Sequence, residues 1–136
     1  MNIDNFDTLL QAAHSETQPQ RLLFVFVAVE LPEEATQQQR AEFEAGEGGT
    51  LTPLMCVDKG LDELSTFEAF SIEANQLDSR WSMVFAAAMS GSGAEAPGSA
   101  DAGPHLQSMV EAIKHGDLAR YLAFDRQGVC MQLGQA

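Results

Sequence analysis

An unbroken run of apolar residues spans positions 22–29, between Arg21 and Glu30, and Pro32 follows it closely. β-Branched and aromatic side chains dominate this run. A strand with one exposed face would alternate apolar and polar residues, so the run predicts a strand that is buried on both faces. A buried helix is the alternative, because an apolar run by itself does not distinguish the two.

Helices are predicted where apolar residues recur at three- and four-residue spacing. This spacing predicts helices over residues 3–14 and 61–77, although an alternating triplet in the middle of the second leaves a break there open. A third helix is expected to begin at Pro104 and to stop at Gly116, because proline suits the first helical position and glycine suits the stop. A polar segment that starts near Thr36 predicts a short surface helix.

Further strands are predicted over residues 50–58, 81–89, 119–124 and 129–133. The first contains Pro53, which lacks a backbone donor, so this strand lies at an edge of the sheet or starts after the proline. The second contains three consecutive alanines, which favour helix and weaken the strand prediction. A turn that ends in glycine joins the last two strands and predicts a hairpin.

Helices that alternate with strands indicate the fold class. We expect an α/β or α+β fold with a mixed, mostly parallel sheet of about five strands, flanked by helices and ending in a C-terminal β-hairpin. The length suits one domain over residues 1–136, and an apolar fraction of 45% is enough for a core. Residues 90–103 are mostly glycine, serine, proline and alanine, which predicts a flexible loop within this domain.

The chain carries a formal net charge of −13, and its seven basic residues are scattered singly. Nucleic acids and anionic membranes attract clustered lysine and arginine, so we expect neither as a partner. Acids occupy the N-terminus where a signal peptide needs basic residues, and no apolar run approaches the roughly 20 residues that span a bilayer. We therefore expect a soluble, cytoplasmic protein. Its two cysteines, Cys56 and Cys130, fit a reducing compartment.

Several segments together carry a resemblance to a family. They are residues 21–32, 43–59, 81–91 and 109–114, with the turn at 124–128. The chain resembles a family of small proteobacterial single-domain proteins of uncharacterised function, over nearly its whole length. Such proteins are sometimes given the name ribonucleotide reductase alpha subunit. That enzyme is a large barrel with a radical cysteine and a second cysteine pair, which a chain of 136 residues with two cysteines cannot supply. The resemblance therefore implies no site residue and no activity.

Neither a metal nor a cofactor is expected. The three histidines, His14, His105 and His115, are far apart, and no paired cysteine or histidine motif occurs. His105 and His115 would lie at opposite ends of one helix, about 15 Å apart. The glycines at 91 and 93 lack the third glycine and the adjoining helix of a dinucleotide-binding fingerprint, and the chain has no Walker lysine.

One set of residues near the predicted strand ends could bind a small molecule. The set comprises Cys56, Asp58, Lys59, Ser90, Gly91, Ser92 and Gly93. Ligands of open α/β sheets bind beyond the carboxyl ends of strands, and a thiol beside an ammonium group can be activated. A buried, inert Cys56 and a surface loop without a ligand are the alternatives. Cys130 lies on the polar side of its predicted strand, so we expect it to be more exposed than Cys56.

We expect an interaction or regulatory protein rather than an enzyme, because no catalytic triad, metal motif or nucleotide fingerprint occurs. Contacts would involve an acidic surface, the 90–103 loop and the edge of the last strand, where a homodimer or another protein partner could pair. The acidic surface comprises Glu33, Glu34, Glu42, Glu44 and Glu47. The alternative is a small-molecule-binding protein or enzyme with its site near Cys56, Asp58, Lys59 and residues 90–93.

Overall fold

The computed structural model describes residues 3–31, 34–44, 50–91 and 95–131. The elements in this part of the chain are α1 (Phe6–Ser15), β1 (Gln20–Glu30), α2 (Gln37–Glu44), β2 (Thr50–Gly60), the 3-10 helix η1 (Leu61–Glu63), α3 (Phe67–Leu77), β3 (Met83–Ser90), α4 (Ser99–Lys114), β4 (Leu122–Phe124) and β5 (Cys130–Met131). Their types and order follow the sequence prediction. The helix predicted over 61–77 is broken, because Leu64 and the N-cap residue Thr66 are extended.

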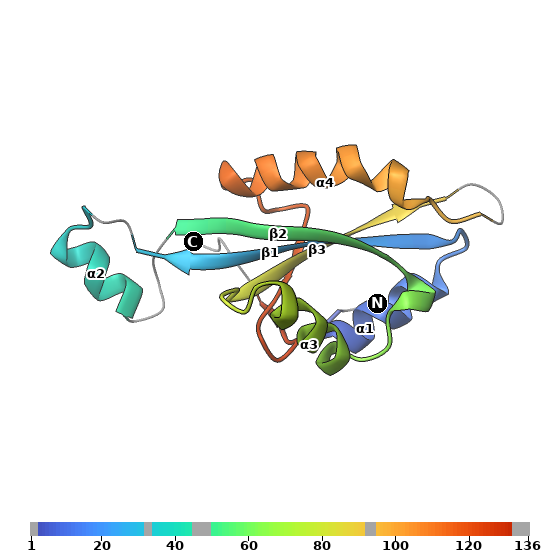
Figure 1. Ribbon diagram of the computed structural model, residues 1–136, viewed down its shortest axis with the longest axis horizontal. Helices are drawn as coiled ribbons and strands as arrows, with labels where there is room; N and C mark the ends of the chain where they lie inside the picture. Colours follow the sequence, from blue (N-terminus) through green and yellow to red (C-terminus); the bar gives the residue numbers. More distant parts are fainter. Residues whose placement is uncertain (1–2, 32–33, 45–49, 92–94, 132–136) are drawn as a thin grey trace.

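The strands form one five-stranded sheet in the order β2-β1-β3-β4-β5, and every neighbouring pair is antiparallel. The predicted mostly parallel sheet is therefore wrong, and the fold is α+β. Helices between strands can occur in parallel and in antiparallel sheets, and only the pairing of the strands distinguishes the two. β2 and β3 do run in the same direction, but β1 lies between them and is antiparallel to both. Figure 1 shows that α2, which connects β1 to β2, extends beyond the sheet instead of covering it.

β1 is buried on both faces, as predicted. Three of its even-numbered side chains, including Phe24, join a cluster with α1 and α3, and three of its odd-numbered ones, including Val25, join a cluster with α4. Figure 1 shows α1 and α3 on one face of the sheet and α4 on the other. Because a strand alternates its side chains between two faces, a strand covered on both sides carries a continuous apolar run.

An aromatic cluster fills the layer between the sheet and the helices α1 and α3. Its members are Phe6, Phe24, Phe26, Phe67, Phe70, Trp81 and Phe124. Phe70 lies at its centre, with its ring centroid 4.6 Å from that of Phe24 and 5.4 Å from that of Phe6. Tilted and stacked pairs at these distances contribute about 0.5–1.5 kcal/mol each beyond their area burial.

α4 begins at Ser99, earlier than the predicted start at Pro104, so residues 99–103 of the predicted loop are helical. Two contacts explain the longer helix. The Asp101 carboxylate accepts a 3.0 Å hydrogen bond from the Gly98 amide, and the Ala102 side chain is completely buried in the cluster beneath α4. Packing of this first turn outweighs the position of the proline. The predicted stop at Gly116 is confirmed by its φ of 77°.

The two outer strands have different edges. β2 lies at one edge, which confirms the prediction from Pro53, and a bulge interrupts its pairing near that proline. β5 is the outermost strand on the other side, but its edge is covered by the segment before α1. The Cys130 amide donates a 2.8 Å hydrogen bond to the Asp4 carbonyl, and the Phe6 amide donates one of 2.8 Å to the Gly128 carbonyl. The predicted free edge at the last strand is therefore occupied along its described residues.

Candidate functional site

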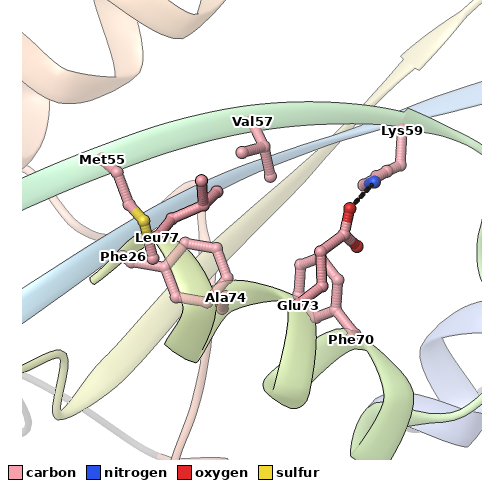
Figure 2. A pocket seen from close by; sticks show the side chains of 8 residues that line it. All are labelled: Phe26, Met55, Val57, Lys59, Phe70, Glu73, Ala74 and Leu77. Carbon is pink, nitrogen blue, oxygen red and sulfur yellow. Dashed lines mark hydrogen bonds and ion pairs between the residues drawn. The ribbon is translucent and has the colours of Figure 1, made fainter. Parts of the chain in front are cut away.

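The structure does not bring the predicted site residues together. Lys59 lies on the face of β2 that packs against α3, where its ammonium group lies 2.6 Å from the Glu73 carboxylate (Figure 2). Successive residues of a strand point to opposite faces, so Asp58 and Cys56 lie on the side of α4. An ammonium group on the far side of the sheet cannot activate the Cys56 thiol.

Asp58 belongs to a half-buried ion pair. Its carboxylate accepts a 2.7 Å hydrogen bond from Nε of Arg21 on β1, and its side chain is only 16% exposed. Burial alone would raise the pKa of Asp58, but the hydrogen bond and the charge of Arg21 outweigh that effect and lower it. Glu63 lies 3.7 Å from the same guanidinium group. Asp58 is thus a charged partner of Arg21 that ties β2 to β1.

The relative exposure of the two cysteines is the reverse of the prediction. Cys56 is exposed on the edge strand, whereas Cys130 is half-buried against the aromatic cluster. Burial and the nearby negative charge of Asp4 raise the pKa of the Cys130 thiol. The expected greater exposure of Cys130 is wrong, because the segment before α1 pairs with its strand.

The hollow between β2 and α3 is too small for a ligand. Figure 2 shows its lining of apolar side chains from both elements, with the ion pair of Lys59 and Glu73 at the rim. Its volume is about 20 Å³, which is room for roughly one water molecule.

Ser90 and Gly91 end β3 beside the start of β1. The Ser90 hydroxyl accepts a 2.8 Å hydrogen bond from the Gln20 side chain, and the Gly91 amide donates one of 2.9 Å to the Pro19 carbonyl. A side chain at Gly91 would overlap the carbonyl of Glu95, so these two residues lie in close contact. Ser92 and Gly93 lie outside the described residues.

A different feature stands out beside this strand end. β4 pairs only with residues 84–86 of β3, whereas β3 continues to Ser90. Antiparallel strands alternate residues that bond one neighbour with residues that bond the other. Since the Gly91 amide bonds Pro19 on the side of β1, Ala88 and Ser90 direct their backbone groups away from β1. Both residues are exposed, and no strand covers this edge in the described part of the chain.

Cavities flank this open edge on both faces of the sheet. The α4-side cavity has a volume of about 440 Å³ and is lined by Leu23, Ala87, Ala88, Met89, His105, Ser108, Met109, Arg120 and Tyr121. The α1-side cavity has a volume of about 220 Å³ and is lined by Ile3, Leu9, Ala12, Ala13, Glu16, Gln20, Leu22, Ala86, Ala87, Ala88, Arg120 and Leu122. We call the free edge of residues 88–90, together with these two cavities, the β3 notch.

The sequence analysis missed the β3 notch, although two signals point to it. The strand predicted over 119–124 is shorter than the one predicted over 81–89, and where the two pair, the longer strand extends past its neighbour. The alanines at 86–88 leave space on both faces at that place. Alanine here makes room for other atoms, whereas the sequence suggested only a weaker strand.

Comparisons of the chain with models of protein families, with curated proteins and with solved structures find no match. None of the helices in the described ranges is both long and apolar enough to cross a bilayer. In the same ranges, no three side chains of His, Cys, Asp or Glu are grouped closely enough to share a metal ion.

Proposed function

We propose that this protein is a non-enzymatic interaction domain that binds an extended segment of a partner protein as an added strand along the β3 notch. The observation that carries this proposal is the free edge, where the backbone groups of Ala88 and Ser90 point outward. Strand addition uses such groups for affinity and uses pockets for alternate side chains for specificity. The cavities on either face supply space for those side chains.

The other edges of the sheet are less suited to strand addition. The outer side of β5 already pairs with the segment before α1. β2 carries Pro53 and a bulge within its length, and proteins use both features to prevent edge pairing. The β3 notch is therefore the edge at which a short strand meets the fewest obstacles.

Charge favours a different protein as the partner. Two copies of a chain with a net charge of −13 repel each other, which opposes a homodimer at this site. Of the predicted acidic surface, Glu34, Glu42 and Glu44 are exposed, and Glu33 and Glu47 lie outside the described residues. These charges would keep the free domain soluble and would attract partners with a basic segment.

A proline at Ala88 tests the proposal. Ala88→Pro removes the outward amide and places a ring at the edge, and it leaves the bonds to β1 intact because this amide points away from them. Ala88→Ser is the matched control, since it keeps the amide. Peptides of twelve residues would be selected from a displayed random library on the full chain. We expect them to bind Ala88→Ser like the wild type and to lose at least tenfold in affinity for Ala88→Pro.

Hydrogen exchange gives an independent measure of the same binding. A bound peptide should slow exchange of the Ala88 and Ser90 amides and leave exposed amides of α2 unchanged. Peptides that bind Ala88→Pro as tightly as the wild type would contradict the proposal. So would a selection that enriches no peptide, provided that circular dichroism shows the target to be folded.

A small-molecule-binding protein is the second candidate, and the α4-side cavity favours it. His105, Ser108, Arg120 and Tyr121 contribute polar groups there that suit an anionic ligand. Inorganic phosphate or a small carboxylic acid would serve as probes in calorimetry. Binding that persists in Ala88→Pro but is lost in Arg120→Ala would favour this function over strand addition.

A further inference from the structure

We infer that the α4-side cavity binds a monocarboxylic acid with a short aliphatic chain, whose carboxylate meets Arg120 and His105 and whose chain lies on the apolar floor. This inference rests on the small-molecule-binding function, the second candidate, and does not require an added strand. It follows from the charge of the cavity lining, from the separation of polar and apolar groups within it, and from its size.

The lining of the α4-side cavity differs in charge from the rest of the chain. The chain has 20 acidic and 7 basic residues, yet Arg120 and His105 line the cavity and no acidic residue does. Neither side chain forms an ion pair with another residue in the described part of the chain. Asp101, one turn before His105, lines the neighbouring hollow and bonds the Gly98 amide. The cavity therefore favours an anionic ligand.

The polar groups of the cavity come from two segments. α4 contributes His105 and Ser108, which are three residues apart and so lie on the same side of the helix. The connection between α4 and β4 contributes Arg120 and Tyr121. Arg120, His105 and Ser108 are exposed, so they form the rim of the cavity. A guanidinium group binds a carboxylate through two parallel hydrogen bonds, which places the acid group of the ligand at this rim.

The floor of the cavity is apolar. Leu23 and Met109 are only 3% and 1% exposed, and both belong to the cluster between the sheet and α4. Ala87 and Met89 complete the floor and pack against the same cluster. Unbranched methionine side chains adapt to the shape of a bound group. An aliphatic chain on this floor gains affinity because its surface leaves water.

The size of the cavity and the net charge of the chain restrict the anion further. A volume of about 440 Å³ lies within the range of about 300–1,000 Å³ that is typical of small-molecule sites. The net charge of −13 repels every anion at long range, and this repulsion increases with the charge of the ligand. A monocarboxylate with an apolar chain is therefore favoured over inorganic phosphate and over a dicarboxylate.

Calorimetric titration of the full chain with hexanoate at pH 7 tests the inference. Acetate keeps the acid group without the chain, and 1-hexanol keeps the chain without the charge. We expect hexanoate to bind at least about tenfold tighter than acetate, 1-hexanol or inorganic phosphate. Arg120→Gln should weaken hexanoate binding about tenfold, because it removes the charged partner of the carboxylate. Arg40→Gln, at an exposed position on α2, is the matched control and should leave the affinity unchanged.

A substitution on the floor tests where the chain of the ligand lies. Ala87→Leu places a larger side chain in the cavity, and we expect it to weaken hexanoate binding at least about tenfold while acetate binding changes little. Unfolding curves of each variant would show that the losses do not come from loss of the fold.

The outcomes separate this inference from the proposed functions. Equal affinities for hexanoate and acetate, or for the wild type and Arg120→Gln, would overturn the assigned binding mode. Phosphate that binds tighter than hexanoate would overturn the ligand class and leave a small-molecule-binding function. Absence of binding by every probe would overturn the inference together with that second function. None of these results bears on strand addition, which the displayed peptides and Ala88→Pro test separately.

Discussion

The guanidinium group of Arg126 lies 4.3 Å from the centre of the Trp81 ring and donates a 2.7 Å hydrogen bond to the Trp81 carbonyl. It also bonds the Asn75 side-chain oxygen at 3.2 Å, and that oxygen accepts a 3.0 Å bond from the Trp81 ring nitrogen. One side chain in the β4–β5 turn therefore holds the end of α3 and the entry to β3.

Replacement of Arg126 should destabilise the protein. Arg126→Ala removes the cation–π contact and leaves the Trp81 carbonyl without its donor, so we expect the free energy of unfolding to fall by about 2 kcal/mol. Arg40→Ala, at an exposed position on α2, is the control and should change it by less than about 0.5 kcal/mol. Urea unfolding followed by circular dichroism measures both. Equal effects of the two substitutions would show that the contact with Trp81 contributes nothing.

Two glycines with similar backbone angles should respond differently to alanine. Gly128 has a φ of 82°, and a Cβ there would lie 2.8 Å from Cγ of the Phe67 ring. Gly116 has a φ of 77° with open space around it. We expect Gly116→Ala to cost about 1 kcal/mol from backbone strain alone, and Gly128→Ala to cost about 3 kcal/mol because the aromatic cluster must also move. Thermal unfolding measures the loss of stability in both variants. A similar loss at both positions would show that the overlap with the Phe67 ring adds no cost.

The ion pair of Arg21 and Asp58 should make stability depend on pH. The folded state lowers the pKa of Asp58, so the stabilisation is fully present above the unfolded pKa of 3.8 and disappears as the pH falls through the lower folded pKa. Asp58→Asn should reduce the free energy of unfolding by about 1–2 kcal/mol at pH 7. The difference from the wild type should shrink below about pH 4. Asp117→Asn, at an exposed position, is the control in the same urea titrations, and a deficit that stays constant down to pH 2 would contradict the linkage.

The two thiols should react at different rates. Cys56 is exposed, whereas Cys130 is half-buried and has a raised pKa, so it holds less thiolate at neutral pH. In the native protein we expect iodoacetamide to modify Cys56 about tenfold faster than Cys130. The single variants Cys56→Ser and Cys130→Ser, followed by mass spectrometry, separate the two rates. Denaturant should abolish the difference, and equal rates in the native state would exclude the protection of Cys130.

The sequence by itself determined the kinds of element and much of their placement. The run at 22–29 identified the buried central strand, because only a strand covered on both faces needs apolar residues at every position. Pro53 identified an edge strand, and Gly116 identified the end of a helix. These features depend on neighbouring residues and on local backbone limits, which the order of amino acids expresses directly.

The tertiary structure alone decided the pairing of the strands and the position of the candidate site. Whether neighbouring strands run parallel depends on contacts between distant residues, such as Leu23 with Asp58 and with Ala87, and no local pattern encodes their direction. The predicted site depended on Asp58 and Lys59 acting together, but alternation along β2 places them on opposite faces of the sheet. The β3 notch arises because β4 stops short of the end of β3, a difference in length that matters only once the two strands lie side by side.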